Sequence, residues 1–152
     1  MITRFEQFTA VISGIYRYIQ KLERDEMVKR GYKGAFALYL ATLKRFDGGL
    51  TSTELCEICD KDKAAVSRVI AEMEEKGLVE RPKNSVRAYR SKITLTEKGR
   101  ETADFVAERA RLALGAVSGE IMSEEEREKF YKILDGIYFN LRKVGSEGIP
   151  QE

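Results

Sequence analysis

This chain has few of the side chains that most often act as nucleophiles, bases or metal ligands, namely cysteine and histidine. The two cysteines, Cys56 and Cys59, form a C-x-x-C pair, and the sequence contains no histidine. Such a pair is either a redox motif or half of a metal site. A four-ligand zinc site would need ligands from other residues or a second subunit, so no metal site is predicted. Two interpretations stay open for the thiols: small apolar packing residues, or a redox switch.

The common catalytic motifs are missing. The sequence has no histidine base, no Gly-rich phosphate loop and no serine nucleophile elbow. Carboxylates are abundant, but they fall at helix caps or on charged helix faces, so acid–base catalysis has no support beyond their number. We therefore predict no catalytic residue, no cofactor and no enzymatic activity.

One segment is cationic without any acid. It contains Arg81, Lys83, Arg87, Arg90 and Lys92. A charge run is usually a solvated face. This one directly follows a helix-turn-helix pattern, where phosphate contacts are needed and where counterion release drives most nonspecific DNA affinity. The acidic run from Glu120 to Glu128 is interpreted as plain surface, with Ser123 and Glu126 forming a capping box.

The elements that must position these groups follow from capping residues and hydrophobic periodicity. Thr51 with Glu54 predicts a capped helix that ends near Cys59, and Asp62 can cap the next one. The core face of that second helix recurs at i, i+3, i+4 and i+7: Val66, Val69, Ile70 and Met73. Its opposite face then presents Lys63, Ala64, Ser67 and Arg68. These residues lie on the first turns, where a recognition helix meets base edges.

A small hairpin completes this unit. Gly77 supplies a helix stop, and strands are predicted at 78–81 and 92–95 around the basic loop. Thr96 then caps a long helix. The fold class predicted is mainly α with a small β-hairpin wing, that is, a winged helix-turn-helix.

Both ends of the chain predict amphipathic helices. A helix from about Thr3 to Lys29 carries a narrow apolar stripe: Phe5, Phe8, Ile12, Ile15, Ile19 and Leu22. A later helix carries a second stripe: Phe130, Ile133, Leu134, Ile137 and Leu141. The first helix would run about 40 Å, longer than a small domain needs to cover. We expect these helices to form a dimer interface rather than to pack only on their own domain.

Length and composition fit one domain. The chain has 152 residues, 43% hydrophobic and 34% charged. We predict a single domain over 1–152, with 1–30 and 97–145 for dimerisation and 34–96 for DNA binding. The longest apolar stretch, 35–43, is far shorter than the roughly 20 residues that a bilayer needs. Without a signal pattern, a cytoplasmic protein with no membrane partner is expected.

Three segments, in this order and spacing, carry a resemblance to a known family: LTSTELCE, AAVSRVIAEMEEKGLVER and ITLTEKGRE. Over essentially its whole length, the chain resembles the MarR-type (multiple antibiotic resistance regulator) transcription factors. The resemblance implies an obligate homodimer, two wings in adjacent minor grooves, repression of nearby promoters, and often release by a small ligand or an oxidant. Oxidant-sensing relatives place their reactive cysteine near the N-terminus, where this chain has none.

The chain departs from the family in the wing. Many members carry an Asp-x-Arg there, whereas the aligned positions are Arg87, Ala88 and Tyr89. A narrow minor groove attracts any well-placed arginine, so either Arg87 or Arg90 can make that contact.

The sequence therefore predicts a homodimeric repressor that binds an inverted repeat in double-stranded DNA near its own promoter. The predicted DNA contacts are Ser52, Thr53, Lys61, Lys63, Ala64, Ser67, Arg68, Lys83, Arg87 and Arg90. A pocket for a small apolar or aromatic ligand is predicted from Tyr16, Phe36, Tyr39 and Phe46. The alternative is a ligand- or protein-binding module whose winged fold does not bind DNA.

Overall fold

The computed structural model describes residues 3–82, 91–118 and 121–149. Along these residues lie α1 (Arg4–Lys29), α2 (Phe36–Lys44), α3 (Ser52–Cys59), α4 (Lys63–Glu75), β1 (Val79–Glu80), β2 (Thr94–Leu95), α5 (Glu97–Ser118) and α6 (Glu124–Glu147). The chain divides into two compact units, 1–112 and 113–152. None of the described helices is both long and apolar enough to cross a membrane.

The long helix α1 begins and ends where the sequence predicts. The Thr3 side chain accepts a hydrogen bond from the Glu6 N–H, and the Glu6 carboxylate accepts one from the Thr3 N–H. This reciprocal capping satisfies two backbone donors that a helix start leaves open. Gly31, with φ of +79°, follows the last turn. Met27 near the C-terminal end is the buried residue of α1, so that end contributes to the core.

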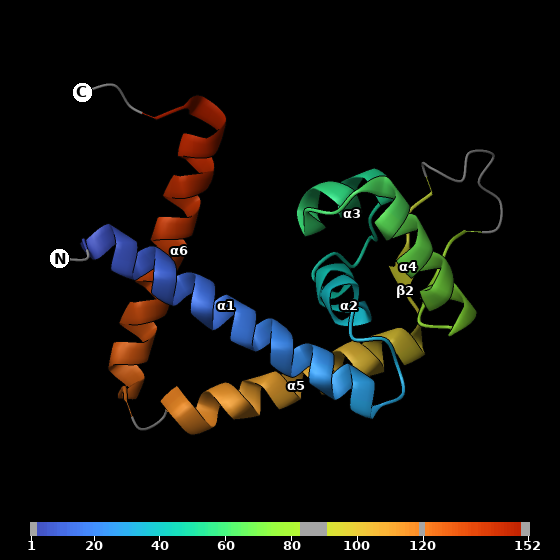
Figure 1. Ribbon diagram of the computed structural model, residues 1–152, viewed down its shortest axis with the longest axis horizontal. Coiled ribbons are helices and arrows are strands. Elements are labelled where there is room, and N and C mark those ends of the chain that lie inside the picture. The colour runs from blue at the N-terminus through green and yellow to red at the C-terminus, as the bar shows by residue number, and fades with distance from the viewer. Residues whose placement is uncertain (1–2, 83–90, 119–120, 150–152) are drawn as a thin grey trace. The chain divides into compact units, whose positions relative to one another are not determined.

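Helix α2 is the centre of the first unit. It contacts α1, α3 and β2, and it lies between α1 and α3 in Figure 1. The sequence predicts a helix over 35–46, whereas α2 ends at Lys44. The reason is a tightened last turn: the N–H groups of Arg45 and Phe46 donate to carbonyls three residues back. Phe46 therefore lies beyond the helix, with 37% of its surface exposed.

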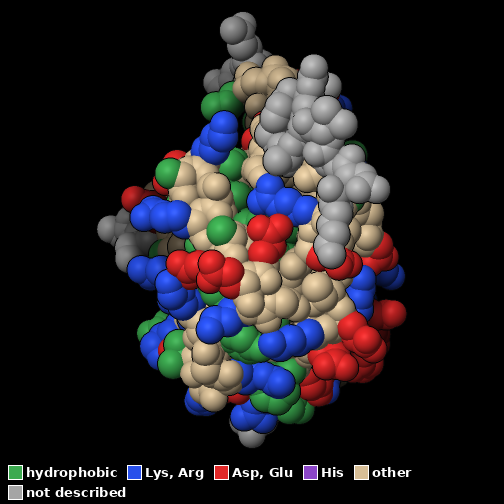
Figure 2. Space-filling model, turned by 90° about the vertical axis from the view of Figure 1, so that its right-hand side faces the viewer, with side chains coloured by type: hydrophobic (Ala, Val, Ile, Leu, Met, Phe, Trp, Pro, Cys, Tyr) green, Lys and Arg blue, Asp and Glu red, His purple; other side chains and the backbone are tan. Residues whose placement is uncertain are grey.

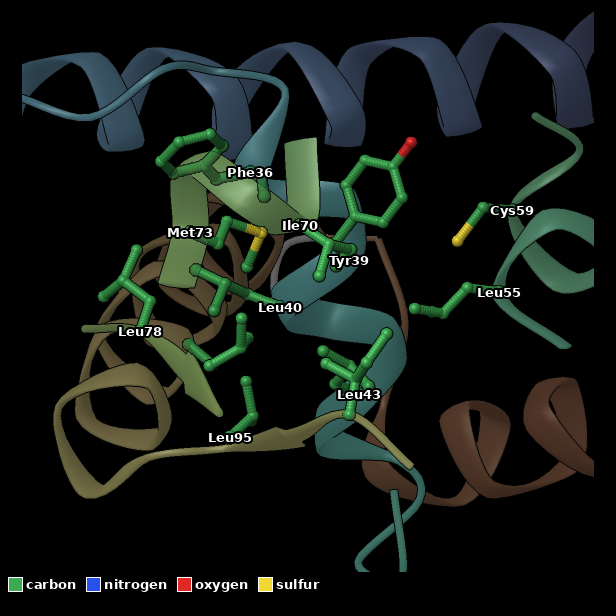
Figure 3. Close-up of a cluster of buried hydrophobic side chains, with 14 of the residues drawn as sticks. Phe36, Tyr39, Leu40, Leu43, Leu55, Cys59, Ile70, Met73, Leu78 and Leu95 are labelled. Carbon is green, nitrogen blue, oxygen red and sulfur yellow. The ribbon is translucent and has the colours of Figure 1, made fainter. Parts of the chain in front are cut away.

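The core is built from α2, α3, α4 and the strands around them. Figure 3 shows ten labelled side chains of this cluster: Phe36, Tyr39, Leu40, Leu43, Leu55, Cys59, Ile70, Met73, Leu78 and Leu95. The predicted core face of α4 is confirmed, because Val66, Ile70 and Met73 are fully buried and Val69 is half-buried. This packing fixes which face of α4 points outward.

The hairpin is shorter than predicted. β1 and β2 pair antiparallel, Val79 opposite Leu95, and an isolated bridge joins Leu50 to Ile93. Thr96 caps α5 as predicted, since its hydroxyl accepts from the Gly99 N–H at 3.0 Å.

Backbone packing explains the glycine of the TEKGRE segment. A Cβ at position 99 would lie 1.8 Å from the Leu78 carbonyl oxygen, so only glycine fits there. The start of α5 is thereby held directly against the residue that leads into β1.

The second unit contains α6. The Ser123 hydroxyl accepts a hydrogen bond from the Glu126 N–H, and the Ser123 N–H donates one to the Glu126 carboxylate, so the predicted capping box is confirmed. No residue of α6 is buried within the chain.

Candidate nucleic-acid interface

The first helix of the helix-turn-helix is fixed by its cap. The Glu54 carboxylate accepts hydrogen bonds from the Thr51 N–H at 2.7 Å and from the Thr51 hydroxyl at 2.9 Å. These bonds, the backbone one first, lower the pKa of Glu54. Ser52, half-buried, and Thr53, exposed, consequently occupy the first turn of α3, where backbone N–H groups favour an anion such as phosphate.

The turn that follows sets the direction of α4. Asp60 adopts the left-handed conformation, with φ of 51°, and the Lys61 N–H donates to the Cys56 carbonyl at 3.0 Å. The Asp62 carboxylate then accepts from the Ala65 N–H at 2.9 Å. This bond is the largest cause of a lowered pKa for Asp62, to which the charge of Arg68 contributes. The acid at the start of α4 is thus engaged with its own helix.

The outward face of α4 carries the predicted contact residues. Lys63, Ala64, Ser67 and Arg68 are all exposed, on the first two turns. The acids come later: Glu72 pairs with Lys33 at 2.7 Å, and Glu75 lies at the end of the helix. Figure 2 shows Lys and Arg side chains alternating with Asp and Glu on this side of the molecule, rather than one continuous basic surface. Along α4 itself, the exposed cations therefore lie in the first two turns and the acids follow them.

The structure corrects one member of the predicted cationic segment. Arg81 is not a wing cation facing solvent, because its guanidinium Nε lies 3.0 Å from a carboxylate oxygen of Glu74 at the end of α4. Lys92 is exposed. The predicted wing contacts Lys83, Arg87 and Arg90 lie outside the described residues.

The stripe predicted for dimerisation is largely exposed on α1. Phe5 is 72% exposed, and Phe8, Ile12 and Ile15 are exposed as well, while Ile19 is half-buried. On α6, Phe130, Ile133 and Leu141 are exposed, and Leu134 and Ile137 are half-buried.

A pocket of about 300 Å³ lies between α1, α2 and α4. Of the four predicted pocket residues, it is lined by Tyr39. Phe36 is a core residue and borders a different hollow, Tyr16 is exposed on α1, and Phe46 lies beyond the end of α2. Sequence reasoning missed the polar lining of this pocket, because only the fold brings α1 beside the turn before α4.

The cysteine pair is mostly withdrawn from solvent. Cys59 is 7% exposed and Cys56 is half-buried. Burial is the main cause of a raised pKa for the Cys59 thiol, which lies 3.5 Å from the Thr42 hydroxyl. A raised pKa keeps the thiol protonated and less nucleophilic, as in a packing residue. Among the described residues, no cluster of three or more potential ligands could hold a metal ion.

Comparison with known proteins gives a family match over part of the chain and a fold over nearly all of it. Residues 31–86 match the model of the MarR family. One similar structure is that of a protein from Listeria monocytogenes described as a MarR-family transcriptional regulator, solved with 26mer DNA. It superposes with a TM-score of 0.72 at 18% identity, over 95% of this chain and 97% of that one. A MarR transcriptional regulator from Methanosarcina mazei Go1 gives 0.75 at 23% identity, over 91% and 99%.

A third similar structure carries a ligand. It is a MarR-family protein from Mycobacterium tuberculosis in complex with salicylic acid, with a TM-score of 0.63 at 20% identity, over 84% of this chain and 93% of that one. At these identities the solved structures show a shared fold. Curated proteins yield no match to this sequence.

Proposed function

We propose that this chain is a DNA-binding transcriptional regulator of the MarR family, supported by the family match over residues 31–86 and the shared fold, and that it acts as a homodimeric repressor of its own promoter. The family is one of regulators rather than enzymes. The operator in this proposal is an inverted repeat, with half-site centres about one helical turn, roughly 10 bp, apart.

The observation that carries the proposal is the division of α4. Val66, Ile70 and Met73 of its inner face are fully buried, while the outer face of its first two turns exposes two cations and two small residues: Lys63, Ala64, Ser67 and Arg68. Small side chains permit close approach to base edges, and an arginine can bind a guanine edge with two hydrogen bonds. In this proposal Ser52, Thr53 and Lys61 contact phosphates, and Lys83, Arg87 and Arg90 hold the wing to the DNA.

The proposed dimer rests on the exposed apolar stripe of α1 and on that of α6. Large exposed apolar surfaces are rare on monomers and mark interaction sites. Two-fold symmetry in the protein would match an inverted repeat in the DNA. Release by a small ligand is part of the proposal, because a change in the separation of two DNA-binding units would remove their match to the groove spacing.

Fluorescence anisotropy tests the proposal. The purified protein is titrated against the duplex upstream of its own coding sequence and against a scrambled duplex, across a salt series. We expect tight binding that prefers the upstream duplex and weakens steeply with salt. Weak binding to both duplexes at low salt would favour the alternative of an interaction module that does not bind DNA.

A further inference from the structure

The pocket between α1, α2 and α4 combines apolar walls with three charged groups. Its apolar lining comes from Ala35, Ala37, Leu38, Tyr39, Ala65 and Val69. Its charged and polar lining comes from Gln20, Glu23 and Arg24 of α1 and from Lys61 of the turn before α4. The volume of about 300 Å³ falls at the lower end of the range for small-molecule sites.

Glu23 is a carboxylate that lacks a partner within the described part of the chain. The next two carboxylates of α1 are both engaged: Asp25 pairs with Lys21 at 2.6 Å, and Glu26 pairs with Lys29 and Arg109. Glu23 is half-buried, forms no hydrogen bond or ion pair there, and has a raised pKa because burial outweighs the charge of Arg24. A desolvated carboxylate in a pocket favours a cationic hydrogen-bond donor.

The two cations of the pocket are also without a carboxylate partner in the described residues. Neither Arg24 nor Lys61 forms an ion pair there. Arg24 is exposed, and the backbone of Gly34 passes close to it, since a Cβ at position 34 would lie 3.1 Å from the Arg24 Cβ. Unpaired cations at the rim favour an anionic group, and a guanidinium suits a carboxylate.

Tyr39 supplies the remaining polar group. Figure 3 shows its ring beside the core and its hydroxyl directed toward α1. The hydroxyl makes no hydrogen bond within the described residues, and the residue lines the pocket. One pocket therefore offers an anion, two cations, a hydroxyl and an apolar wall.

We propose that this pocket binds a small zwitterionic amino-carboxylate with an aromatic or apolar body. The ammonium group of the ligand pairs with Glu23, its carboxylate pairs with Arg24 and Lys61, and its body lies against Leu38 and Val69. A molecule with one charge pairs with only part of this lining and forgoes the other charge-assisted hydrogen bonds.

The pocket also touches the recognition helix. Ala65 and Val69 lie one turn apart on α4, and the Ala65 N–H is the donor that Asp62 binds at the start of that helix. A ligand here contacts the same two turns that present Lys63 and Arg68. We assign the pocket a regulatory role on DNA binding; this part, unlike the binding site itself, rests on the proposed function.

Calorimetry with three probes of matched shape tests the site on the full chain without DNA. The probes are L-phenylalanine, which carries both charges, phenethylamine, which is only cationic, and 3-phenylpropionate, which is only anionic. We expect L-phenylalanine to bind about tenfold or more tightly than either analogue, the ratio that corresponds to one charge-assisted hydrogen bond. No binding of L-phenylalanine, or equal binding of all three, would overturn the site.

Two variants assign the charges, and one serves as control. Glu23→Gln should remove the preference for L-phenylalanine over 3-phenylpropionate, and Arg24→Met should remove its preference over phenethylamine. Asp25→Asn removes an exposed carboxylate of the same helix that does not line the pocket, so it should change nothing. A Glu23→Gln protein that keeps the full preference, or an Asp25→Asn protein that loses it, contradicts the assignment.

Anisotropy on the same preparations separates this inference from the proposed function. Specific DNA binding without L-phenylalanine binding overturns the pocket and leaves the DNA-binding proposal intact. L-phenylalanine binding without DNA binding overturns the DNA-binding proposal and leaves the pocket intact. A saturated pocket that leaves DNA affinity unchanged would overturn the regulatory role while the binding site stands.

Discussion

Individual charged side chains in this protein differ mainly in whether the fold gives them a partner. Asp62 is engaged by the backbone of its own helix, Arg81 is engaged by Glu74, and Arg68 is exposed on the outward face of α4. An exposed arginine at this position can bind bases, whereas one paired within the protein has less to offer DNA. The function of each residue thus follows from its surroundings rather than from its type.

Arg68→Ala should relax sequence preference. Loss of a bidentate contact to one base costs about 1–3 kcal/mol on the cognate duplex and much less on a scrambled one. Anisotropy on both duplexes measures the difference. Arg111→Ala is the matched control, because Arg111 is an exposed arginine whose guanidinium is bonded to Glu108 of its own helix. Equal losses on both duplexes would count against base contact by Arg68.

Glu23→Gln should stabilise the protein near neutral pH. The folded state raises the pKa of Glu23, chiefly through burial, so it holds that proton more tightly than the unfolded state. Above the pKa of Glu23 in the folded protein, the ionised carboxylate therefore lowers the free energy of unfolding. This penalty disappears as the pH falls from that pKa to the pKa of Glu23 in the unfolded chain. Charged groups lining the hollows beside Glu23 are Arg24 on α1, Lys44 on α2 and Lys61 in the turn.

Thermal unfolding at about pH 7 and at about pH 4 checks this, since the usual pKa of glutamate lies near the lower value. The stability gained by Glu23→Gln should be present at the higher pH and should be smaller at the lower pH. Asp25→Asn should show no gain near neutral pH, because a bond from Lys21 lowers the pKa of Asp25. A gain for Asp25→Asn matching that of Glu23→Gln would exclude burial as the cause.

At the scale of elements, α4 is positioned by contacts at both of its ends. At its start stands the Asp62 cap, and after its last turn the chain leads through Gly77 into Leu78 and β1. The Thr96 N–H donates to the Leu78 carbonyl, and the Thr96 hydroxyl donates to the Gly77 carbonyl at 2.6 Å. The cap of α5 is therefore bonded to the segment that follows α4, which links α4 to the next long helix.

Gly99→Ala should destabilise the fold. Its new methyl group would lie within van der Waals overlap of the Leu78 backbone, and backbone atoms cannot move aside as a flexible side chain can. Gly115→Ala on the same helix meets no atom within 4 Å, so it should be neutral or stabilising by about 0.5–1 kcal/mol. Chemical denaturation of both variants measures the contrast. A Gly99→Ala protein as stable as Gly115→Ala would disprove the close approach.

At the scale of the whole molecule, two long helices expose rows of large apolar side chains. Phe5, Ile12 and Ile15 are exposed along α1, and Phe130, Ile133 and Leu141 along α6. Both helices are capped and regular, so these side chains are held in place along their helices. Burying them against a second copy of the chain would remove this surface from water, which is the main favourable term in association.

Ile15→Asp should dissociate the proposed dimer. A carboxylate within an apolar interface carries a large desolvation penalty without a partner. Ser13→Asp adds the same charge to an exposed position of α1 outside the stripe and should leave assembly unchanged. Light scattering after size-exclusion chromatography gives the mass of each variant. A wild-type protein that is already monomeric, or an Ile15→Asp protein that stays dimeric, would contradict the proposed interface.

What the sequence determined by itself is local. The caps at Thr3, Thr51, Asp62 and Ser123 and the two faces of α4 all depend on residues a few positions apart. Within a helix, spacing alone fixes which side chains share a face, so these features could be predicted without a structure. The family resemblance rested on the same segments. The predicted DNA contacts and dimer stripes remain predictions, because each involves a second molecule.

Only the tertiary structure decided what depends on residues far apart in the chain. It paired Arg81 with Glu74, placed Gly99 on the Leu78 carbonyl, and left Tyr39 alone of the predicted aromatics in the pocket. It also brought Glu23 of α1 beside Lys61 and α4, across some forty positions of sequence. Distances of this kind arise from how helices pack, and no periodicity along one helix contains them.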